Sequence, residues 1–464
     1  MDSIWFQFPS NINNHKKVDS DMSCDVTIVG GGLTGLTCSY YLSKKGIKNI
    51  LLEKDTLMSK TSGNTTAKVT AQHGLFYKYL IDNFGIENAK KYLNVNLHAI
   101  KNIKNIIDTE NINCDFEFQD SYVYTSSKSY VQNINDELDA LKSLNFNANF
   151  CQEIPLPIPQ VLCAIKFPHQ AQFNPIKYAQ GLNNSIINNG GILFENSQVI
   201  DIKRIKDSFF VYVNGHIITS KYVILATRYP FINFPGFYFL KMYQSLSYCS
   251  AYEIPSQNYS GIYINAETPT LSARFVKNEN KNILLVSGCD HKVGIKSNPP
   301  NPYSVLNSFA HSISPGAKLI SSWVTEDCIS LDKLPYIGQF SSIIPNMFIA
   351  TGFKKWGMTF SNIASNIIVD NILGEKNIYS TLFDSTRFHP IKNKEEMKNI
   401  LKESASSLII KKFKKPNNPT CQHLGCELSW NSVNNTWDCP CHGSRFDSTG
   451  KVLYGPSQHD LTNL

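Results

Sequence analysis

The chain has 464 residues, 42% of them hydrophobic, which is more than one compact unit usually holds and predicts two or three domains with ample core. Its formal net charge of +7 is small for this length, and the lysines alternate with asparagines instead of clustering with aromatic residues, so a nucleic-acid partner is not expected. No run of 18 or more uncharged apolar residues predicts a membrane span, and the N-terminus lacks the pattern of a secretory signal. We therefore expect a soluble, cytoplasmic protein.

The first patterned segment has the order strand, helix, strand. A buried strand over residues 25–29 runs directly into residues 30–35, which have the form G-x-G-x-x-G. Apolar residues at helical spacing then extend to Gly46, and a second short strand over residues 50–52 ends at Glu53. These elements predict a βαβ unit.

Each glycine of this motif has a physical task in a dinucleotide-binding loop. Gly30 permits the tight turn, Gly32 lets the backbone approach a pyrophosphate, and Gly35 permits close packing of helix on strand. The helix N-terminus then faces the phosphates, and Glu53 stands where a carboxylate can accept hydrogen bonds from an adenosine ribose. A chance glycine loop is the alternative, and the complete βαβ context favours dinucleotide binding over it.

Three further segments indicate which dinucleotide is bound. They are a hydroxyl-rich stretch, an Asn-Gly hairpin that leads into an apolar strand, and a sequence of the form D-x-x-P-x-I-G, A-T-G-F and G-M-T. They occupy residues 61–70, 209–227 and 332–359. Together with the glycine motif, they resemble the FAD-dependent oxidoreductases of the D-amino-acid oxidase and glycine oxidase superfamily.

This resemblance implies an α/β fold, with a Rossmann-like FAD-binding domain and an inserted α+β substrate domain. Within the first insertion, apolar residues at helical spacing predict one long helix. They are Leu93, Leu97, Ile100, Ile103 and Ile107. His98 on that helix is expected to be a surface or packing residue rather than a ligand. The candidate FAD-binding residues are Gly30, Gly32, Leu33, Thr34, Gly35, Glu53, Lys54, Thr65, Thr66, Ala226, Thr227, Gly338, Gly352, Gly357, Met358 and Thr359.

The resemblance also implies the class of reaction. Such enzymes transfer a hydride from a carbon that bears an amine to the flavin, so a cation or hydrogen-bond donor that anchors a substrate carboxylate is expected nearby. A surface ion pair or loop contact is the alternative role for each candidate. The candidates are Arg228, Arg274, His73, His291 and Lys292.

The composition changes after residue 375, where Lys, Asn and Glu become frequent. Residues 395–407 are predicted to form a charged helix, and residues 411–418 a basic, proline-punctuated linker. The segment after this linker has the form C-x-H, fifteen residues, then C-x-x-H, which resembles the signature of Rieske iron–sulfur domains. In such a small all-β domain, Cys421 and Cys439 would hold one iron of a [2Fe–2S] cluster, and His423 and His442 the other.

Further residues of this segment match the Rieske family. Cys426 and Cys441 occupy the positions that form a disulfide between the two ligand loops in respiratory-type members. The pair Gly455-Pro456 matches the proline loop that covers the cluster, and Ser444 matches the serine whose hydroxyl bonds a cluster sulfur. Phe446 stands where some relatives carry a tyrosine, which implies fewer hydrogen bonds to the cluster and a lower potential.

Two alternatives to a working cluster remain at this point. Two cysteines and two histidines could instead bind zinc, although the C-x-H order, the second cysteine pair and the proline loop argue against it. Only about 45 residues remain for this domain, and the strands that usually precede the first ligand loop are missing from the sequence. The domain is therefore expected either to depend on packing against the flavin domain or to hold its cluster poorly.

The expected organisation joins a two-electron centre to a one-electron centre. An amine or amino-acid-like substrate would reduce FAD, and the cluster would pass electrons singly to a carrier. One alternative is reverse flow, in which a reduced carrier passes electrons through the cluster to the flavin. The other is a non-catalytic redox sensor. A Rieske oxygenase is disfavoured, because no 2-His-1-carboxylate motif is visible. The predicted units are an arm around Trp5 (1–23), the oxidoreductase (24–375, with FAD-binding segments near 24–75, 176–230 and 330–375), a helix and linker (376–418) and the Rieske domain (419–464).

Overall fold

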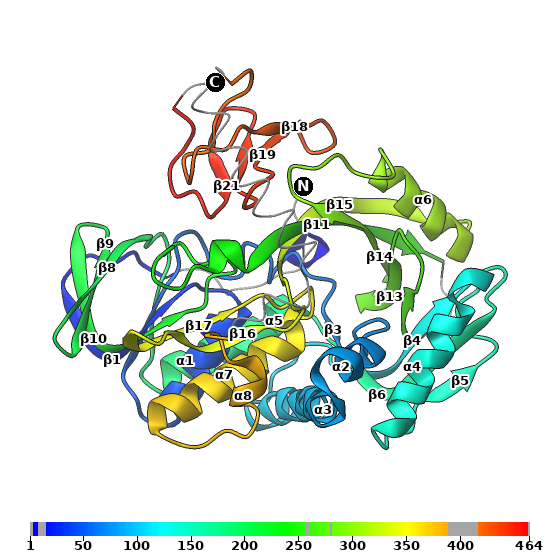
Figure 1. The fold of residues 1–464 in the computed structure, drawn as a ribbon, viewed down its shortest axis with the longest axis horizontal. Helices are drawn as coiled ribbons and strands as arrows, with labels where there is room; N and C mark the ends of the chain where they lie inside the picture. The colour runs from blue at the N-terminus through cyan, green and yellow to red at the C-terminus, as the bar shows by residue number, and fades with distance from the viewer. Residues whose placement is uncertain (1–2, 8–14, 256–258, 279–280, 388–415, 463–464) are drawn as a thin grey trace.

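The computed structural model describes residues 3–7, 15–255, 259–278, 281–387 and 416–462. They form two large β-sheets with helices packed on them and a small third sheet near the C-terminus (Figure 1). This arrangement confirms the predicted α/β fold with an all-β C-terminal unit. The charged helix predicted at residues 395–407 lies outside the described residues.

The first large sheet has eight strands and contains the predicted βαβ unit. Its strands lie in the order β16-β17-β10-β1-β2-β7, with β9 paired to β10 and β8 to β9. Thr27 of β1 lies opposite Val223 of β10 and Ile50 of β2, both in parallel pairs. Asn214 and Gly215, both with positive φ, turn β9 into β10 as the hairpin prediction requires. The strands are β1 (Met22–Val29), β2 (Asn49–Leu52), β7 (Ile192–Phe194), β8 (Val199–Ile205), β9 (Ser208–Val213), β10 (His216–Leu225), β16 (Tyr336–Ser341) and β17 (Ile344–Thr351).

Helices α1 (Leu33–Lys44), α5 (Pro175–Asn188) and α7 (Gly357–Leu373) pack on this sheet. Val26, Ile28 and Leu51 are almost fully buried beneath them, which explains why these strands are continuous apolar runs. Figure 1 shows α1 and α7 side by side on one face, and α1 also contacts α5. The helices that come after β1 and β17 thus contact each other on the same sheet, although β10 lies between the two strands.

The second large sheet has nine strands in the order β15-β11-β14-β13-β12-β4-β6-β3, with β5 paired to β6. Because β3 pairs with β6, the predicted FAD-binding segment 24–75 contributes a strand to this sheet as well. The strands are β3 (Lys68–Val69), β4 (Glu117–Thr125), β5 (Asn149–Cys151), β6 (Cys163–Gln172), β11 (Met242–Ile254), β12 (Ile262–Asn265), β13 (Leu271–Asn278), β14 (Lys281–Lys292) and β15 (Lys318–Ser330).

The long helix α3 (Ile86–Thr109) confirms the helix predicted in the first insertion. Ile100, Ile103 and the other predicted apolar positions are buried or partly buried, whereas His98 is exposed, with its Nδ1 3.2 Å from the hydroxyl of Tyr379. The remaining helices are α2 (Tyr77–Phe84), α4 (Val131–Ser143), α6 (Pro302–Ile313), α8 (Ser380–Phe383) and the 3-10 turns η1 (Ile4–Gln7), η2 (Lys128–Tyr130) and η3 (Tyr238–Leu240). None of the described helices is long and apolar enough to cross a membrane.

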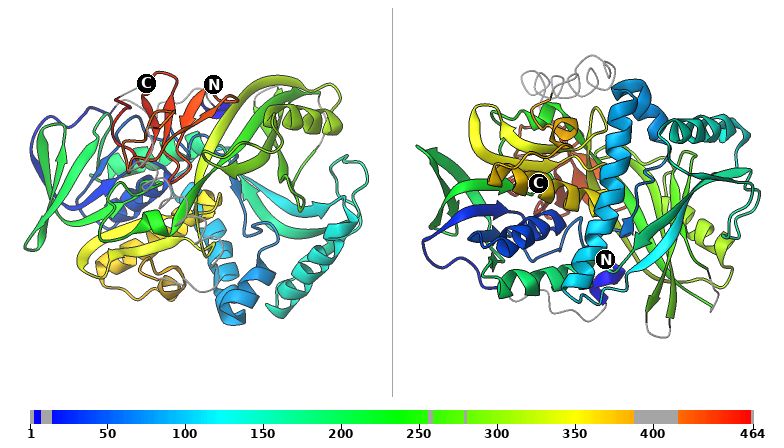
Figure 2. Two further views of the ribbon diagram at one scale, coloured as in Figure 1. Left: turned by 45° about the horizontal axis from the view of Figure 1, so that its top comes forward. Right: turned by 90° about the horizontal axis from the view of Figure 1, so that it is seen from below.

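The small C-terminal sheet lies against the long strands β11 and β15, as the left view of Figure 2 shows. Its four strands lie in chain order, β18-β19-β20-β21, each antiparallel to the next. They are β18 (Ser429–Asn431), β19 (Thr436–Asp438), β20 (Arg445–Asp447) and β21 (Val452–Tyr454). All four strands come after the loop that contains Cys421 and His423, and this part of the chain packs on β11 and β15.

The apolar patch of the N-terminal arm packs into the oxidoreductase. Trp5 is fully buried, and its indole N–H donates a hydrogen bond of 2.6 Å to the carbonyl of Thr65. Ser3 likewise donates its hydroxyl proton to the carbonyl of Gly63. The arm therefore fixes the backbone of the hydroxyl-rich segment from behind.

Candidate cofactor and substrate site

A cavity of about 730 Å³ is lined by both large sheets and by the C-terminal domain. The eight-stranded sheet contributes the loop after β1 and the end of β10, and the nine-stranded sheet contributes the side chains of β11, β13, β14 and β15. Residues 451–460 of the C-terminal domain line the same cavity. Segments far apart in the sequence thus meet around one space.

The glycine loop has the close contacts that a dinucleotide-binding turn needs. A Cβ on Gly35 would lie 1.9 Å from the carbonyl oxygen of Gly30, so only glycine lets the helix approach the turn. A Cβ on Gly32 would lie 2.9 Å from the Ser62 hydroxyl, which accepts a hydrogen bond from the N–H of Leu33. This cradle fits the pyrophosphate of FAD.

Glu53 lies at the end of β2 and lines the cavity. Its carboxylate accepts hydrogen bonds from the N–H groups of Gly31 at 2.7 Å and Asp55 at 2.9 Å. Burial raises the pKa of Glu53, and these two donors oppose that effect. The side chain is therefore held rigidly beside the glycine loop, at the position that the sequence predicts for a ribose contact.

Most of the other predicted FAD-binding residues line the cavity as well, and they come from both sides of it. Those that line it are Gly30, Gly32, Thr34, Glu53, Lys54, Thr65, Thr66, Ala226, Thr227, Gly352, Gly357 and Met358. Gly35, Leu33, Gly338 and Thr359 do not line it; Gly35 and Leu33 shape the loop, and Thr359 donates its hydroxyl proton to Asn96 instead. The FAD-binding role of each residue stays a prediction.

Of the predicted substrate anchors, only Arg228 lines the cavity. Its guanidinium already pairs with Glu326 at 2.5 Å and lies 4.7 Å from the ring centre of Tyr454. Arg274 is buried outside the cavity, where it donates to the carbonyls of Ala67 at 2.6 Å and Phe173 at 3.4 Å. Burial lowers the pKa of Arg274 to about 9.

The two predicted histidines also lie outside the cavity wall. His73 stacks on Trp356 with ring centres 4.3 Å apart, and its Nδ1 lies 2.6 Å from the Tyr92 hydroxyl. His291 stacks on Tyr248, and burial lowers the pKa of both imidazoles. Neither residue borders the cavity, so both can act on it only through neighbouring side chains. Lys292, the last residue of β14, does not line the cavity either.

Sequence reasoning missed several charged residues that line the cavity, and Lys68, Asp290, Asp327 and Lys355 are four of them. Lys68 on β3 donates to the hydroxyl of Ser272 at 2.7 Å, and burial lowers its pKa to about 7. Lys355 forms an ion pair of 2.8 Å with Asp290, and Asp327 lies on strand β15. Lys68 lies in the hydroxyl-rich segment, and Asp290 precedes His291 in the sequence. Their positions at the cavity could not be predicted, because no rule of sequence spacing relates strands that pair only in the folded sheet.

The C-terminal domain brings the four predicted cluster ligands together. Cys421 and Cys439 are free and buried, and hydrogen bonds with Cys439 and Ser444 lower the pKa of Cys421 to about 7. The Nδ1 atoms of His423 and His442 are buried and have no hydrogen-bond partner among the described residues. Burial lowers the pKa of His423 to about 4 and that of His442 to about 3, so both imidazoles are neutral at pH 7. Two thiols and two neutral imidazoles, each with an Nδ1 that lacks a partner, fit a Rieske cluster.

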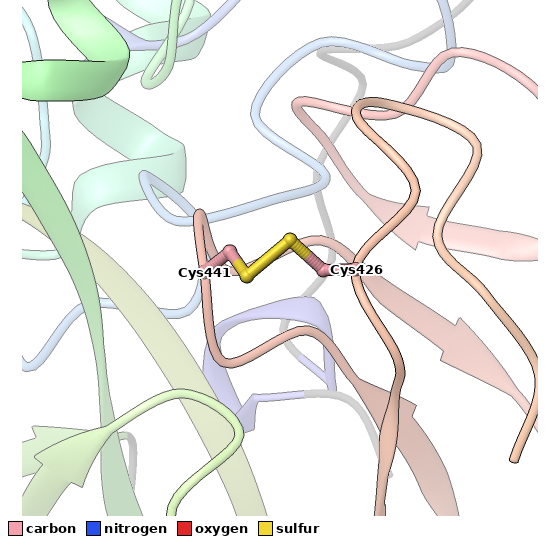
Figure 3. Close-up of a disulfide and its surroundings, with 2 residues drawn as sticks. All are labelled: Cys426 and Cys441. Atoms are coloured by element: carbon pink, nitrogen blue, oxygen red, sulfur yellow. A yellow bond between two sulfur atoms is a disulfide. The ribbon is translucent and has the colours of Figure 1, made fainter. Parts of the chain in front are cut away.

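Cys426 and Cys441 form a disulfide that joins the two ligand loops (Figure 3). Both cysteines are buried, and their sulfur atoms lie within 4.8 Å of the Cys439 sulfur. The pairing that the Rieske resemblance implies is therefore present in the structure. Because the bond is buried beside the ligand loops, solvent thiols have little access to it.

A buried ion network joins the C-terminal domain to the oxidoreductase. Arg445 on β20 is 1% exposed and pairs with Asp438 at 2.9 Å and with Glu326 of β15 at 3.1 Å. Glu326 also pairs with Arg228, whose guanidinium faces the ring of Tyr454 on β21. One carboxylate thus neutralises a cation from each domain.

Oxidoreductase residues also contact both histidines that are predicted to hold the cluster. The side-chain oxygen of Asn233 lies 2.9 Å from Nε2 of His423. Gln244 donates its side-chain N–H to the carbonyls of His442 at 2.6 Å and Gly455 at 2.9 Å, and Phe239 packs edge-on against the His442 ring. The histidine ends of both ligand loops are therefore turned toward the oxidoreductase.

Comparison with known proteins agrees with this geometry. Residues 25–371 match the family model of FAD-dependent oxidoreductases, and residues 412–464 match that of the Rieske [2Fe–2S] domain. The protein YhfW of Bacillus subtilis, whose name describes a Rieske 2Fe–2S iron–sulfur protein, is 33% identical over 99% of this chain and 97% of its own length. Iron–sulfur subunit 1 of the cytochrome b6-f complex of Nostoc sp. is 52% identical over 44 residues, which are 10% of this chain and 25% of that protein.

Solved structures share the fold of the larger unit. Glycine oxidase from Geobacillus kaustophilus superposes with a TM-score of 0.67 at 16% identity, covering 79% of this chain and 100% of its own. L-amino acid deaminase from Proteus vulgaris superposes with a TM-score of 0.66 at 12% identity, covering 82% and 100%. The family match spans most of the chain, and the C-terminal segment matches the Rieske domain. The chain therefore belongs to the FAD-dependent oxidoreductase family and is an FAD-dependent oxidoreductase with a Rieske [2Fe–2S] centre.

Proposed function

We propose that the enzyme oxidises a small amine or amino-acid-like substrate by hydride transfer to FAD, and that electrons then pass singly through the cluster to a separate carrier. The observation that carries this proposal is the shared cavity. Residues 451–460, which include the loop at Gly455-Pro456, line the same space as the glycine loop and the nine-stranded sheet. A substrate site, a flavin site and a cluster domain in contact around one space favour electron transfer within the chain.

The residues on the eight-stranded sheet would hold FAD, which supplies a two-electron acceptor when bound. The glycine loop 30–35 would bind its pyrophosphate and Glu53 its ribose. Thr65 and Thr66 line the cavity on one side and Gly357 and Met358, at the start of α7, on the other. The N-terminus of a helix stabilises negative charge, so α7 is suited to the reduced ring.

The nine-stranded sheet would form the substrate side of the cavity. Ser247, Cys249, Ser272 and Ser287 line it from β11, β13 and β14 and give it a mixed apolar and hydroxyl surface. The amine must lose a proton when its carbon gives up a hydride, and the near-neutral pKa of Lys68 allows this side chain to accept one. The sheet and the C-terminal domain together restrict the access of water to this space.

An anaerobic titration tests the proposal. The purified enzyme is mixed with a panel of amines and amino acids, and flavin absorption and the EPR signal of the reduced cluster are recorded together with iron and sulfide content. We expect at least one compound to bleach the flavin and to produce a rhombic [2Fe–2S] signal. His423→Ala should keep the bleaching and lose the signal, whereas His311→Ala, an exposed histidine on α6, should keep both.

Two outcomes would contradict the proposal. If a reduced one-electron carrier bleaches the flavin and no amine or amino acid does, electrons flow in the reverse direction. If zinc is found in place of iron and sulfide, the C-terminal domain is not an electron-transfer unit.

A further inference from the structure

The charged side chains on the substrate side of the cavity indicate whether the enzyme binds an anionic or a cationic group of its substrate. Amino-acid substrates are commonly held by a cationic side chain that pairs with their carboxylate, and arginine suits this task because its guanidinium binds a carboxylate through two parallel hydrogen bonds. The chain contains five arginines, all within the described residues. A guanidinium that anchors a substrate carboxylate must therefore belong to one of these five.

Every arginine already has a partner. The pairs are Arg204 with Asp207, Arg228 with Glu326, Arg274 with the carbonyls of Ala67 and Phe173, Arg387 with Asp332, and Arg445 with Glu326 and Asp438. Arg228 alone lines the cavity, and moving it toward a substrate would break its buried pair with Glu326. No guanidinium is thus available to take a substrate carboxylate.

The lysines on this side are also engaged. Lys355 pairs with Asp290 at 2.8 Å, which neutralises it. Lys68 donates to the hydroxyls of Ser272 and Thr66, and its burial disfavours the charged form. A ligand carboxylate would therefore meet Lys355, whose charge is already neutralised by Asp290, and Lys68, whose charged form is disfavoured by burial.

Of the described charged residues that line the cavity from the nine-stranded sheet, Asp327 is the one whose side chain lacks a hydrogen bond or ion pair. It lines the cavity from β15, where it lies opposite Ser245 of β11, and its carboxylate has no hydrogen bond or ion pair with any described residue. Burial raises its pKa to about 6, with the charges of Lys355 and Arg228 opposing the effect. A cationic ligand would supply the missing partner, because a partly buried carboxylate is stabilised most by a nearby positive charge.

We propose that the substrate is an amine without a carboxylate beside its reacting carbon, bound as an ammonium cation by Asp327. This inference rests on the proposed amine oxidation and specifies its substrate class. Asp327 thus determines specificity by charge: it attracts an ammonium group and repels the carboxylate of an amino acid.

Binding of two matched probes to the holoenzyme tests the inference. The tert-butylammonium ion and pivalate have the same apolar group with opposite charge, and the amine carbon of the first bears no hydrogen, so neither can be oxidised. Their dissociation constants are measured from the perturbation of the flavin spectrum. We expect the cation to bind at least tenfold more tightly than the anion. Asp327→Asn should weaken cation binding roughly 10- to 100-fold, the usual value of a charge-assisted hydrogen bond, and Asp327→Glu should retain it.

Asp120→Asn is the matched control, because Asp120 is a carboxylate of the same sheet that does not line the cavity. Its cation affinity should equal that of the unaltered enzyme. Tighter binding of pivalate, or an unchanged affinity in Asp327→Asn while flavin content is normal, would overturn the inference. Folding of each variant is checked by its flavin absorption, and Asp327→Glu keeps the test valid if Asp327→Asn does not fold.

A parallel screen separates this inference from the proposed function. Pairs that differ only by a carboxylate, such as isobutylamine with valine and 1,4-diaminobutane with ornithine, are tested for flavin bleaching. Faster bleaching by the amines supports the inference, and faster bleaching by the amino acids overturns it while the proposed function stands. If neither member of any pair bleaches the flavin, the proposed function fails, and the probe affinities still decide whether Asp327 binds cations.

Discussion

Glu326→Gln is expected to weaken the attachment of the Rieske domain to the oxidoreductase. The Glu326 side chain is fully buried on β15, and its carboxylate binds Arg228 at 2.5 Å and Arg445 at 3.1 Å. The substitution keeps the shape of the side chain and removes its charge. Two guanidinium groups, one from each domain, would then share a neutral amide.

The structure sets the size of the effect. Removing one partner of a buried ion pair costs about 3–5 kcal/mol, because the remaining charge stays buried without compensation. Arg445 keeps its second partner, Asp438, and the Arg228 side chain is 18% exposed, so water compensates part of the loss. We therefore expect a decrease of about 3 kcal/mol in the free energy of unfolding, at the lower end of this range.

Urea unfolding of the holoenzyme, followed by loss of the cluster's visible absorption, measures this change. Glu253→Gln is the control, because Glu253 forms an ion pair of 2.9 Å with Lys281 in which both side chains are more than 40% exposed. An exposed pair contributes at most about 1 kcal/mol. Equal unfolding midpoints for the two variants would refute the reasoning that the buried network holds the domains together.

Three further predictions concern the flavin loop, the cluster and the substrate side. Gly35→Ala should yield protein without flavin absorption, because its Cβ would lie 1.9 Å from the Gly30 carbonyl oxygen, whereas Gly316→Ala should bind flavin normally. Asn233→Leu should raise the reduction potential of the cluster by roughly 20–60 mV. The oxidised cluster would make the imidazole N–H of His423 the stronger donor to Asn233, so loss of this hydrogen bond destabilises the oxidised state more than the reduced state. A redox titration measures the shift, and an unchanged potential would contradict the prediction. Affinity for tert-butylammonium should rise as the pH increases through about 6, where Asp327 loses its proton; burial and the charges of Glu326 and Asp290 raise this pKa, whereas those of Lys355 and Arg228 lower it. A pH dependence that persists in Asp327→Asn would exclude Asp327 as its source.

Local patterns predicted the parts of the fold that depend on local physics. The G-x-G-x-x-G turn predicted β1, the helix after it and β2, because a glycine loop between apolar strands permits few other conformations. The amphipathic spacing from Leu93 to Ile107 predicted α3 for a similar reason, since one apolar face every 3.6 residues suits only a helix. The two Rieske ligand loops could be identified because ligand spacing is a property of the sequence alone.

The same reasoning could not place the candidate substrate anchors relative to the cavity. Arg274 and His73 are chemically suitable, yet Arg274 bonds backbone carbonyls outside the cavity and His73 stacks on Trp356 away from it. Nothing local distinguishes a buried structural arginine from one that faces a ligand. Whether an arginine can bind a ligand depends on which side of its strand faces the cavity and on whether its guanidinium already pairs with another residue.

The sequence by itself thus determined the family, the two cofactors and the residue types that suit them, because each signature lies within a short stretch of chain. The tertiary structure decided how the two centres meet. Glu326 and Arg445 are separated by 119 residues in the chain, and no spacing rule relates them, since β15 and β20 come into contact only after folding. The unpaired Asp327 could be recognised only in the same way, because a charge lacks a partner only relative to everything that surrounds it in the folded protein.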